Sequence, residues 1–247
     1  MKKYLICILL TSNLSIIYSQ NLTVKYDYYY KKTDSPVIFE KTSELIITPN
    51  SSLFKIIMNS STIPTIEKVA DKGKKVTVIN DNKPRLTFKN LKNNTLINNE
   101  KILLKEFIVN DSLNIFKWKL ENQNTKTILG YNCNQASLKY RGRNYEAYYA
   151  PEIPIQNGPY KFHGLPGLIL EIKTIDKSLD FKITATSLVK SENNIEITNP
   201  YKDDKQYTWQ EYVTIYKKKY KDLIEYSGEN GSVVSIPKGK IEIIIED

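Results

Sequence analysis

The segment of residues 158–172, GPYKFHGLPGLILEI, constrains the fold more than any other part of this chain. It places three glycines and two prolines around an apolar run. Proline fixes φ and removes a hydrogen-bond donor, whereas glycine opens positive φ and lets another backbone approach closely. The segment therefore predicts one rigid bend that leads directly into a buried strand at residues 168–174.

Most of the remaining chain has patterns typical of β-strands. Residues 21–30 alternate in polarity and are rich in aromatic and β-branched side chains. Similar stretches predict strands at residues 37–48, 53–58, 76–79, 85–88, 101–109, 115–120, 130–140, 145–149, 181–189, 232–236 and 241–245. A hairpin is predicted around the turn at residues 141–144, a polar turn at residues 122–126 and a short helix near residues 66–70.

One longer helix is predicted late in the chain, at residues 208–226. Thr208 is a suitable N-cap, and Glu211 three residues later completes a capping box. Apolar and aromatic side chains recur at a spacing of three to four, and the lysines fall largely on the other side of the helix. Gly228 is expected to end this helix.

These elements predict a mainly β (α+β) fold. Strands and helices do not alternate, so the sheet should be antiparallel rather than parallel. We expect a curved antiparallel sheet or half-open barrel of roughly nine to twelve strands, with the single C-terminal amphipathic helix against its concave face. That outline is LolA-like, similar to the periplasmic lipoprotein carriers.

The first residues have the pattern of a secretory signal peptide. Lys2 and Lys3 precede a short apolar run, and the region ends in a small residue, Ser19. We therefore expect a signal peptide at residues 1–19, a single β-rich domain at residues 20–247, and no transmembrane segment in the mature chain. The expected location is the periplasm, the periphery of the outer membrane, or the extracellular space.

Charge and cysteine content narrow the class of protein. The formal net charge is +9, but the lysines are scattered and form no dense stripe with stacking aromatic residues, so nucleic acid is not an expected partner. Of the two cysteines, Cys7 lies in the signal peptide and only Cys133 lies beyond it. An intrachain disulfide is therefore excluded, and the fold must be stabilised by packing.

Several segments together resemble the GLPGLI family of envelope proteins from Bacteroidetes-type bacteria. The resemblance covers about residues 118–175 and is carried by residues 118–120, 126–136, 141–143, 148–154 and 158–169. Tyr148 stands where the family usually has tryptophan. The resemblance implies an exported protein, and it implies no reaction, because the family has no established biochemical function.

Cys133 and His163 are the first candidates for chemistry. His163 is the only histidine, so the two residues satisfy the count for a Cys–His nucleophilic pair but not for a zinc site. By alternation, Cys133 is predicted to share a strand face with Gln135, Ser137 and Lys139. A buried structural cysteine is the favoured interpretation, since cysteine is among the most frequently buried residues.

Other side chains are candidates for binding. Arg141 and Arg143 straddle the hairpin turn and have the chemistry to hold a phosphate or carboxylate. Tyrosine is favoured at binding surfaces because it combines an apolar ring with a polar tip. The predicted binding residues are Tyr148, Tyr149, Tyr160, His163, Arg141 and Arg143; the predicted structural motif is Gly164, Leu165, Pro166, Gly167, Leu168 and Ile169. Glu152 and Glu171 flank the motif and are candidate paired carboxylates.

No phosphate-binding loop, dinucleotide fingerprint, zinc-protease motif or nucleophile elbow occurs in the sequence. We therefore expect no enzyme activity, no cofactor and no metal. The expected function is binding of an apolar ligand, such as a lipid, an acyl chain or a peptide, in a β-sheet trough. Two alternatives stay open: a protein-interaction accessory of an outer-membrane transporter, and a Cys133/His163 hydrolase.

Overall fold

The structure is a computed structural model. It describes residues 21–33, 38–57, 67–71, 74–78, 84–191, 193, 195–230, 236–239 and 241–245. The predicted signal peptide and most of the strand predicted at residues 232–236 lie outside these residues. Within the described part, no helix combines the length and the apolar character needed to cross a bilayer.

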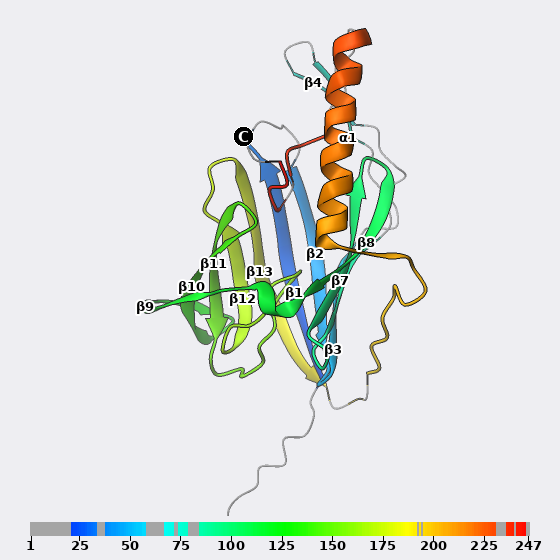
Figure 1. The fold of residues 1–247 in the computed structure, drawn as a ribbon. Helices are drawn as coiled ribbons and strands as arrows, with labels where there is room; N and C mark the ends of the chain where they lie inside the picture. The colour runs from blue at the N-terminus through cyan, green and yellow to red at the C-terminus, as the bar shows by residue number, and fades with distance from the viewer. Residues whose placement is uncertain are drawn as a thin grey trace, which may run out of the picture.

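Fourteen strands, one short 3-10 helix (η1) and one α-helix make up the described fold (Figure 1). In chain order they are β1 (Asn21–Lys32), β2 (Ile38–Ile47), β3 (Ser51–Ile56), β4 (Glu67–Asp71), β5 (Lys74–Val78), β6 (Arg85–Asn90), β7 (Thr95–Ile102), β8 (Lys105–Ser112), η1 (Leu113–Ile115), β9 (Lys119–Ile128), β10 (Tyr131–Tyr140), β11 (Arg143–Ala150), β12 (Leu168–Thr174), β13 (Leu179–Ser191), β14 (Gln206–Thr208) and α1 (Trp209–Asn230).

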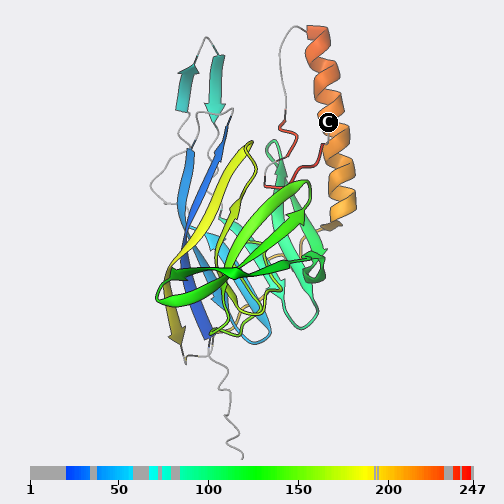
Figure 2. The same cartoon turned by 90° about the vertical axis from the view of Figure 1, so that its left-hand side faces the viewer.

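Twelve of the strands form one sheet, in the order β14-β8-β7-β6-β3-β2-β1-β13-β12-β11-β10-β9. All neighbours are antiparallel except β14, which pairs in parallel with β8. The end strands β14 and β9 do not pair with each other, so the sheet curves but does not close into a barrel (Figure 2). The predicted fold class, a mainly β protein with a curved antiparallel sheet and one C-terminal helix, is confirmed.

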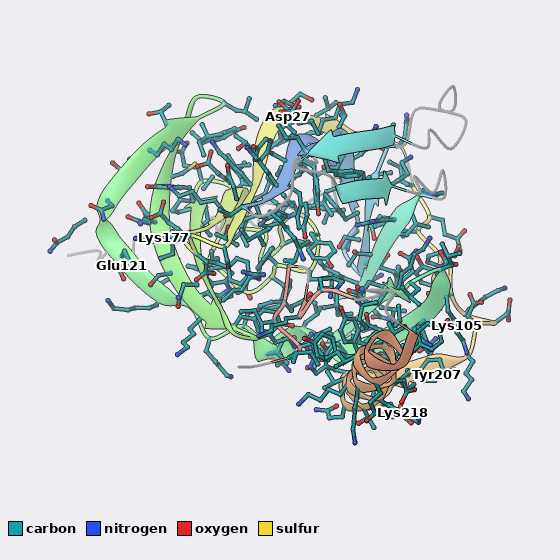
Figure 3. The ribbon with its side chains drawn as sticks, turned by 90° about the horizontal axis from the view of Figure 1, so that it is seen from above. Asp27, Lys105, Glu121, Lys177, Tyr207 and Lys218 are labelled. Carbon is teal, nitrogen blue, oxygen red and sulfur yellow. The ribbon has the colours of Figure 1, made fainter. Side chains whose placement is uncertain are left out.

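The alternation in β1 explains why this strand lies in the centre of the sheet. Leu22, Val24, Tyr26 and Tyr28 are buried on one face, whereas the residues between them are more exposed. Successive side chains of a strand point to opposite faces, so this pattern fixes the register of β1 against both neighbours. Seen from above, the strands surround an interior occupied by side chains (Figure 3).

The glycine- and proline-rich segment of residues 158–167, which we call the motif segment, crosses this interior between β11 and β12. Phe162 and Leu165 are almost completely buried there, and full burial stabilises each by about 1.5–3 kcal/mol. Gly167 passes so close to β11 that an added Cβ would lie 2.3 Å from the carbonyl oxygen of Ala150. No larger residue fits at that position. The predicted strand that follows coincides with β12.

Helix α1 begins as predicted. The Thr208 backbone amide donates to the Glu211 carboxylate at 2.7 Å, and the Glu211 amide donates to the Thr208 hydroxyl at 3.2 Å. These two bonds form the capping box and satisfy two amides that lack helical partners. The helix continues past Gly228 to Asn230, so the predicted stop is two residues early.

The helix packs against the edge of the sheet at β7 and β8. Its Tyr212 and Tyr216 form one cluster with Phe107 and Val109 of β8. The outward side of the helix carries Lys218, which points away from the interior (Figure 3). The helix therefore covers only one end of the concave face, and the motif segment fills the centre.

Five local predictions are wrong. Residues 101–109, predicted as one strand, are divided between β7 and β8 by a turn at residues 103–104. Residues 67–71 form strand β4, which pairs with β5, instead of a short helix. Residues 122–126 belong to strand β9 instead of a turn, and residues 113–115 form η1 before β9 begins. Residues 241–245 form no ladder and make only an isolated bridge between Gly239 and Ile243. Strands β4 and β9 form because the neighbouring strands β5 and β10 pair with them.

The face predicted for Cys133 is also wrong. A register shift between Asn134 and Gln135 interrupts the pairing of β10 with β9. The extra residues of this bulge lie on β9, and the burial pattern of β10 shifts at the same point, because Cys133 and Ala136 are both buried although they are three positions apart. Cys133 lies in the core together with Ala136 and Leu138.

Candidate functional site

The most unusual group in the interior is the ammonium of Lys89 on β6. The residue is 0% exposed, and its Nζ donates to three oxygens within residues 157–162. These are Asn157 Oδ1 at 2.9 Å, the Gly158 carbonyl at 2.7 Å and the Phe162 carbonyl at 2.8 Å. Burial holds the pKa of Lys89 well below its usual value. Lys89 therefore ties the motif segment to the opposite side of the sheet.

A second buried lysine, Lys161, lies between two carboxylates. Its Nζ is 2.7 Å from Glu100 Oε1 on β7 and 2.7 Å from Glu242 Oε1 near the C-terminus. Burial by itself lowers the pKa of Lys161, but the charges of Glu100 and Glu242 outweigh burial and raise it. Lys161 is therefore charged and joins three distant parts of the chain.

Arg141 extends this network of buried charges. Its guanidinium pairs with Asp111 at the end of β8 and lies 3.6 Å from Glu242. It also stacks over the ring of Trp209, 3.4 Å from the ring centroid, at the start of α1. Arg141 has φ of 45°, because it occupies the tight turn between β10 and β11. The turn thus aims this side chain inward, toward α1.

The C-terminal strap, residues 236–239 and 241–245, is bound across the same region (red in Figure 1). Three side chains donate to its backbone carbonyls: Tyr145 to Ile241 at 2.6 Å, Tyr216 to Pro237 at 2.5 Å and Lys32 to Gly239 at 3.2 Å. In addition, the Ile243 amide donates to the Arg141 carbonyl at 2.9 Å. We call the surrounding residues, Lys32, Arg141, Tyr145, Lys161 and Tyr216, the strap cleft. It is the best-organised candidate site in the described structure.

The structure places Arg141 in the strap cleft, and a second predicted binding residue, Tyr160, lies nearby. Tyr160 packs between Phe54 and Phe162, and its hydroxyl lies 3.4 Å from Glu100 Oε1. Arg143 is also buried, and its guanidinium donates to the Ser178 hydroxyl at 3.2 Å. The two arginines therefore contact groups of the chain itself instead of projecting from the turn.

The remaining predicted binding residues lie apart from the cleft. Tyr149 is buried in the main core, and Tyr148 is half-buried under the ammonium of Lys126, 5.4 Å from the ring centroid. The carbonyl of His163 accepts a bond from the Trp118 indole at 2.8 Å. Burial, with a smaller effect of the nearby Lys89 charge, lowers the pKa of His163 to about 4. The imidazole is therefore neutral at pH 7.

Cys133 and His163 do not form a hydrogen-bonded pair. The Cys133 thiol is 3.6 Å from the Tyr131 carbonyl, whereas His163 Nδ1 is buried and has no hydrogen-bond partner among the described residues. Burial raises the pKa of Cys133 to about 11, and the charges of Glu152 and Glu171 add to the effect. A thiol with such a pKa carries almost no thiolate at pH 7 and is a poor nucleophile.

Glu152 and Glu171 also have separate partners. Glu171 is 1% exposed and accepts from Lys126 at 2.7 Å and from Thr184 at 3.1 Å, whereas Glu152 accepts from the Asn132 amide at 3.3 Å. Burial raises the pKa of Glu171, but the bonded Lys126 and nearby Lys182 lower it below its usual value. Among the described residues, no three His, Cys, Asp or Glu side chains are grouped to hold a metal ion.

Two open depressions lie elsewhere on the described surface. The larger, of about 520 Å³, is lined by Asp27, Tyr28, Tyr29, Glu40, Lys41 and Thr42 on β1 and β2. The smaller, of about 360 Å³, is lined by Tyr207, Gln210, Glu211, Thr214 and Ile215 beside the first turns of α1. Neither is lined by the motif segment, whose apolar side chains belong to the core.

Lys89, Glu100, Lys161 and Glu242 were not among the residues predicted from the sequence. Each of these residues is charged, and charged side chains are usually exposed to solvent, so the sequence predicts a surface position for each. The one available signal was local: Lys161 lies inside an otherwise apolar and glycine-rich run. Their partners lie 60 or more residues away, so their pairing could not be inferred.

Comparison with known proteins relates this fold to part of a longer protein, PNGF-II. Residues 103–217 match a family described as "N-glycanase peptide, N-terminal domain". Two crystal structures of PNGF-II, in space groups C2 and P21, align with TM-scores of 0.50 and 0.51 at 18% and 19% identity. The alignments cover 81% and 82% of this chain but only 32% and 34% of PNGF-II. The likeness establishes a shared fold over about a third of PNGF-II. No curated protein matches the sequence.

Proposed function

We propose that this chain is a non-enzymatic protein-interaction domain of the bacterial envelope. The proposal rests on one observation: other parts of the chain already occupy the concave side of the sheet. Phe162 and Leu165 of the motif segment fill its centre, and the C-terminal strap is bound across its open side by side-chain donors. A surface that holds a turn of polypeptide through its backbone carbonyls has the chemistry of peptide recognition.

An apolar small molecule in a sheet trough is the weaker candidate. The trough would have to form where Phe162 and Leu165 now pack, and Lys89 holds residues 157–162 through three hydrogen bonds. Displacing it would expose buried apolar surface and leave a buried ammonium without partners. A protein partner requires no such rearrangement.

Two further considerations support an accessory role in the envelope. The same fold in PNGF-II occupies about a third of a longer chain, as expected for a domain that works beside others. Export to the envelope and kinship with the GLPGLI proteins are part of this proposal, and they rest on residues 1–19 and 118–175 of the sequence.

Native mass spectrometry of the protein isolated gently from the periplasm of an expressing bacterium tests the proposal. We expect the mass of the processed polypeptide without a bound small molecule, and chemical crosslinking in the same cells should attach a second protein. The unfolded sample serves as the control for covalent additions. A bound mass of a few hundred daltons that is lost on unfolding would instead establish the small-molecule trough.

A further inference from the structure

The C-terminal strap folds back on itself as a turn, since the Ile244 and Ile245 amides both donate to the Lys238 carbonyl, and it forms no strand of the sheet. Apart from one amide of Ile243, its described backbone contacts to the rest of the chain are made by the side chains of Tyr145, Tyr216 and Lys32. These three donors come from β11, α1 and β1, three separate elements of a rigid scaffold. Recognition of backbone carbonyls in this way is independent of the sequence of the bound segment.

Sequence selectivity comes from the strap's own side chains. Ile241 and Ile244 are buried in two different apolar clusters of the fold. Glu242 between them is 5% exposed and faces Lys161 at 2.7 Å and Arg141 at 3.6 Å. The cleft therefore accepts a carboxylate flanked by aliphatic side chains, in the pattern Ile-Glu-x-Ile.

The charges of the cleft stay paired without the strap. Lys161 keeps its bond to Glu100 at 2.7 Å, and Arg141 keeps its pairing with Asp111 and its stacking on Trp209. Release of Glu242 thus leaves neither cation without a partner, which avoids the usual penalty for vacating a buried ionic site. This arrangement permits one carboxylate-bearing segment to be exchanged for another.

We propose that the strap cleft is a peptide-recognition site, which this chain fills with its own strap and which takes from a partner protein a turn-forming segment with the pattern Ile-Glu-x-Ile. The inference rests on the proposed interaction function and specifies its site and its partner. Because a tethered segment has an effective concentration in the millimolar range, the resident strap must be weakened before a free peptide competes measurably.

The test is fluorescence anisotropy with a labelled synthetic peptide of residues 236–247 and the full-length protein. Glu242→Gln in the protein removes the charge of the resident strap and keeps its shape. Since a charge-assisted hydrogen bond contributes about 1.5–3 kcal/mol, this variant should bind the peptide roughly ten- to hundredfold more tightly than wild type does. A peptide carrying Glu242→Gln is the matched ligand control and should bind at least about tenfold more weakly. Glu225→Gln, in an exposed helical ion pair, is the matched protein control.

The inference is overturned if the folded Glu242→Gln protein binds both peptides equally or binds neither saturably. If that variant does not fold, hydrogen exchange of the wild type decides: the Ile243 amide should exchange through local opening, faster than the amides of β1. Exchange of Ile243 only through global unfolding would show a permanent strap and overturn the inference. Crosslinking to a partner in the absence of peptide binding would refute this site alone, whereas a bound small molecule would refute the proposed function.

Discussion

Replacement of Lys89 by methionine is the sharpest test of how the interior is held together. Methionine keeps the length of the side chain but removes the ammonium and its three hydrogen bonds to Asn157, Gly158 and Phe162. Asn157 Oδ1 retains a bond from the Gly158 amide at 2.8 Å, so the Gly158 and Phe162 carbonyls are the acceptors that lose this partner.

The magnitude follows from those two carbonyls. A buried acceptor left unsatisfied costs about 1–3 kcal/mol, which gives about 2–6 kcal/mol for the pair. The variant also avoids the desolvation of an ammonium group, which offsets part of this loss. We therefore expect a net destabilisation of about 2–4 kcal/mol, equivalent to a decrease in Tm of about 5–15 °C for a domain of this size.

Denaturant titration and thermal unfolding of the Lys89→Met protein measure this loss. Lys139→Met, at an exposed position on β10, is the matched control and should change stability by less than about 0.5 kcal/mol. Folding lowers the pKa of Lys89, so the unfolded chain binds more protons than the folded chain does. The free energy of unfolding of the wild type therefore includes a contribution that increases with pH, up to the pKa of lysine in the unfolded chain. Lys89→Met should lack that contribution. Equal stability of Lys89→Met and Lys139→Met would refute the role assigned to the ammonium.

Three further outcomes are expected. Burial lowers the pKa of His163 to about 4, so its contribution to stability is complete above pH 6.5 and is lost as the pH decreases toward 4. The variant His163→Phe should therefore show a smaller decrease in Tm over that pH range. An unchanged dependence of Tm on pH would contradict the burial of the imidazole. Gly167→Ala should destabilise the protein by more than about 2 kcal/mol in denaturant titration, because its Cβ would meet the Ala150 carbonyl. The control Gly130→Ala has open space around its Cβ and should cost about 1 kcal/mol, for its positive φ alone. Cys133 should react with a thiol reagent at pH 8 only after unfolding in urea, since burial raises its pKa to about 11; rapid labelling of the native protein would be inconsistent with a core position.

Local rules predicted a large part of the architecture. The alternation of β1, the hairpin of β10 and β11 and the capping box of α1 depend on residues close together in the chain, and the structure contains all three. The same rules failed where a strand is polar and its conformation depends on the strands that pair with it. Strand β7 is polar and forms only because β6 and β8 flank it, and β9 continues through a polar stretch because β10 pairs with it.

The candidate site was recoverable only in part. Arg141 and Tyr160 were recognised from a turn and from an aromatic-rich motif, but their charged partners were not. Lys89 and Lys161 resemble ordinary surface lysines in the sequence, because hydropathy carries no information about a carboxylate or carbonyl that lies far away. Their burial becomes understandable only with the acceptors in view.

By itself the sequence determined the class of fold, the bend at residues 158–167 and the start of the helix, since periodicity, proline, glycine and capping act over a few residues. Tertiary structure decided which charges are buried, that Cys133 faces the core and that the C-terminal strap occupies the open side of the sheet. Those outcomes depend on long-range contacts, whose free energy arises only when desolvation and pairing occur together in the folded chain.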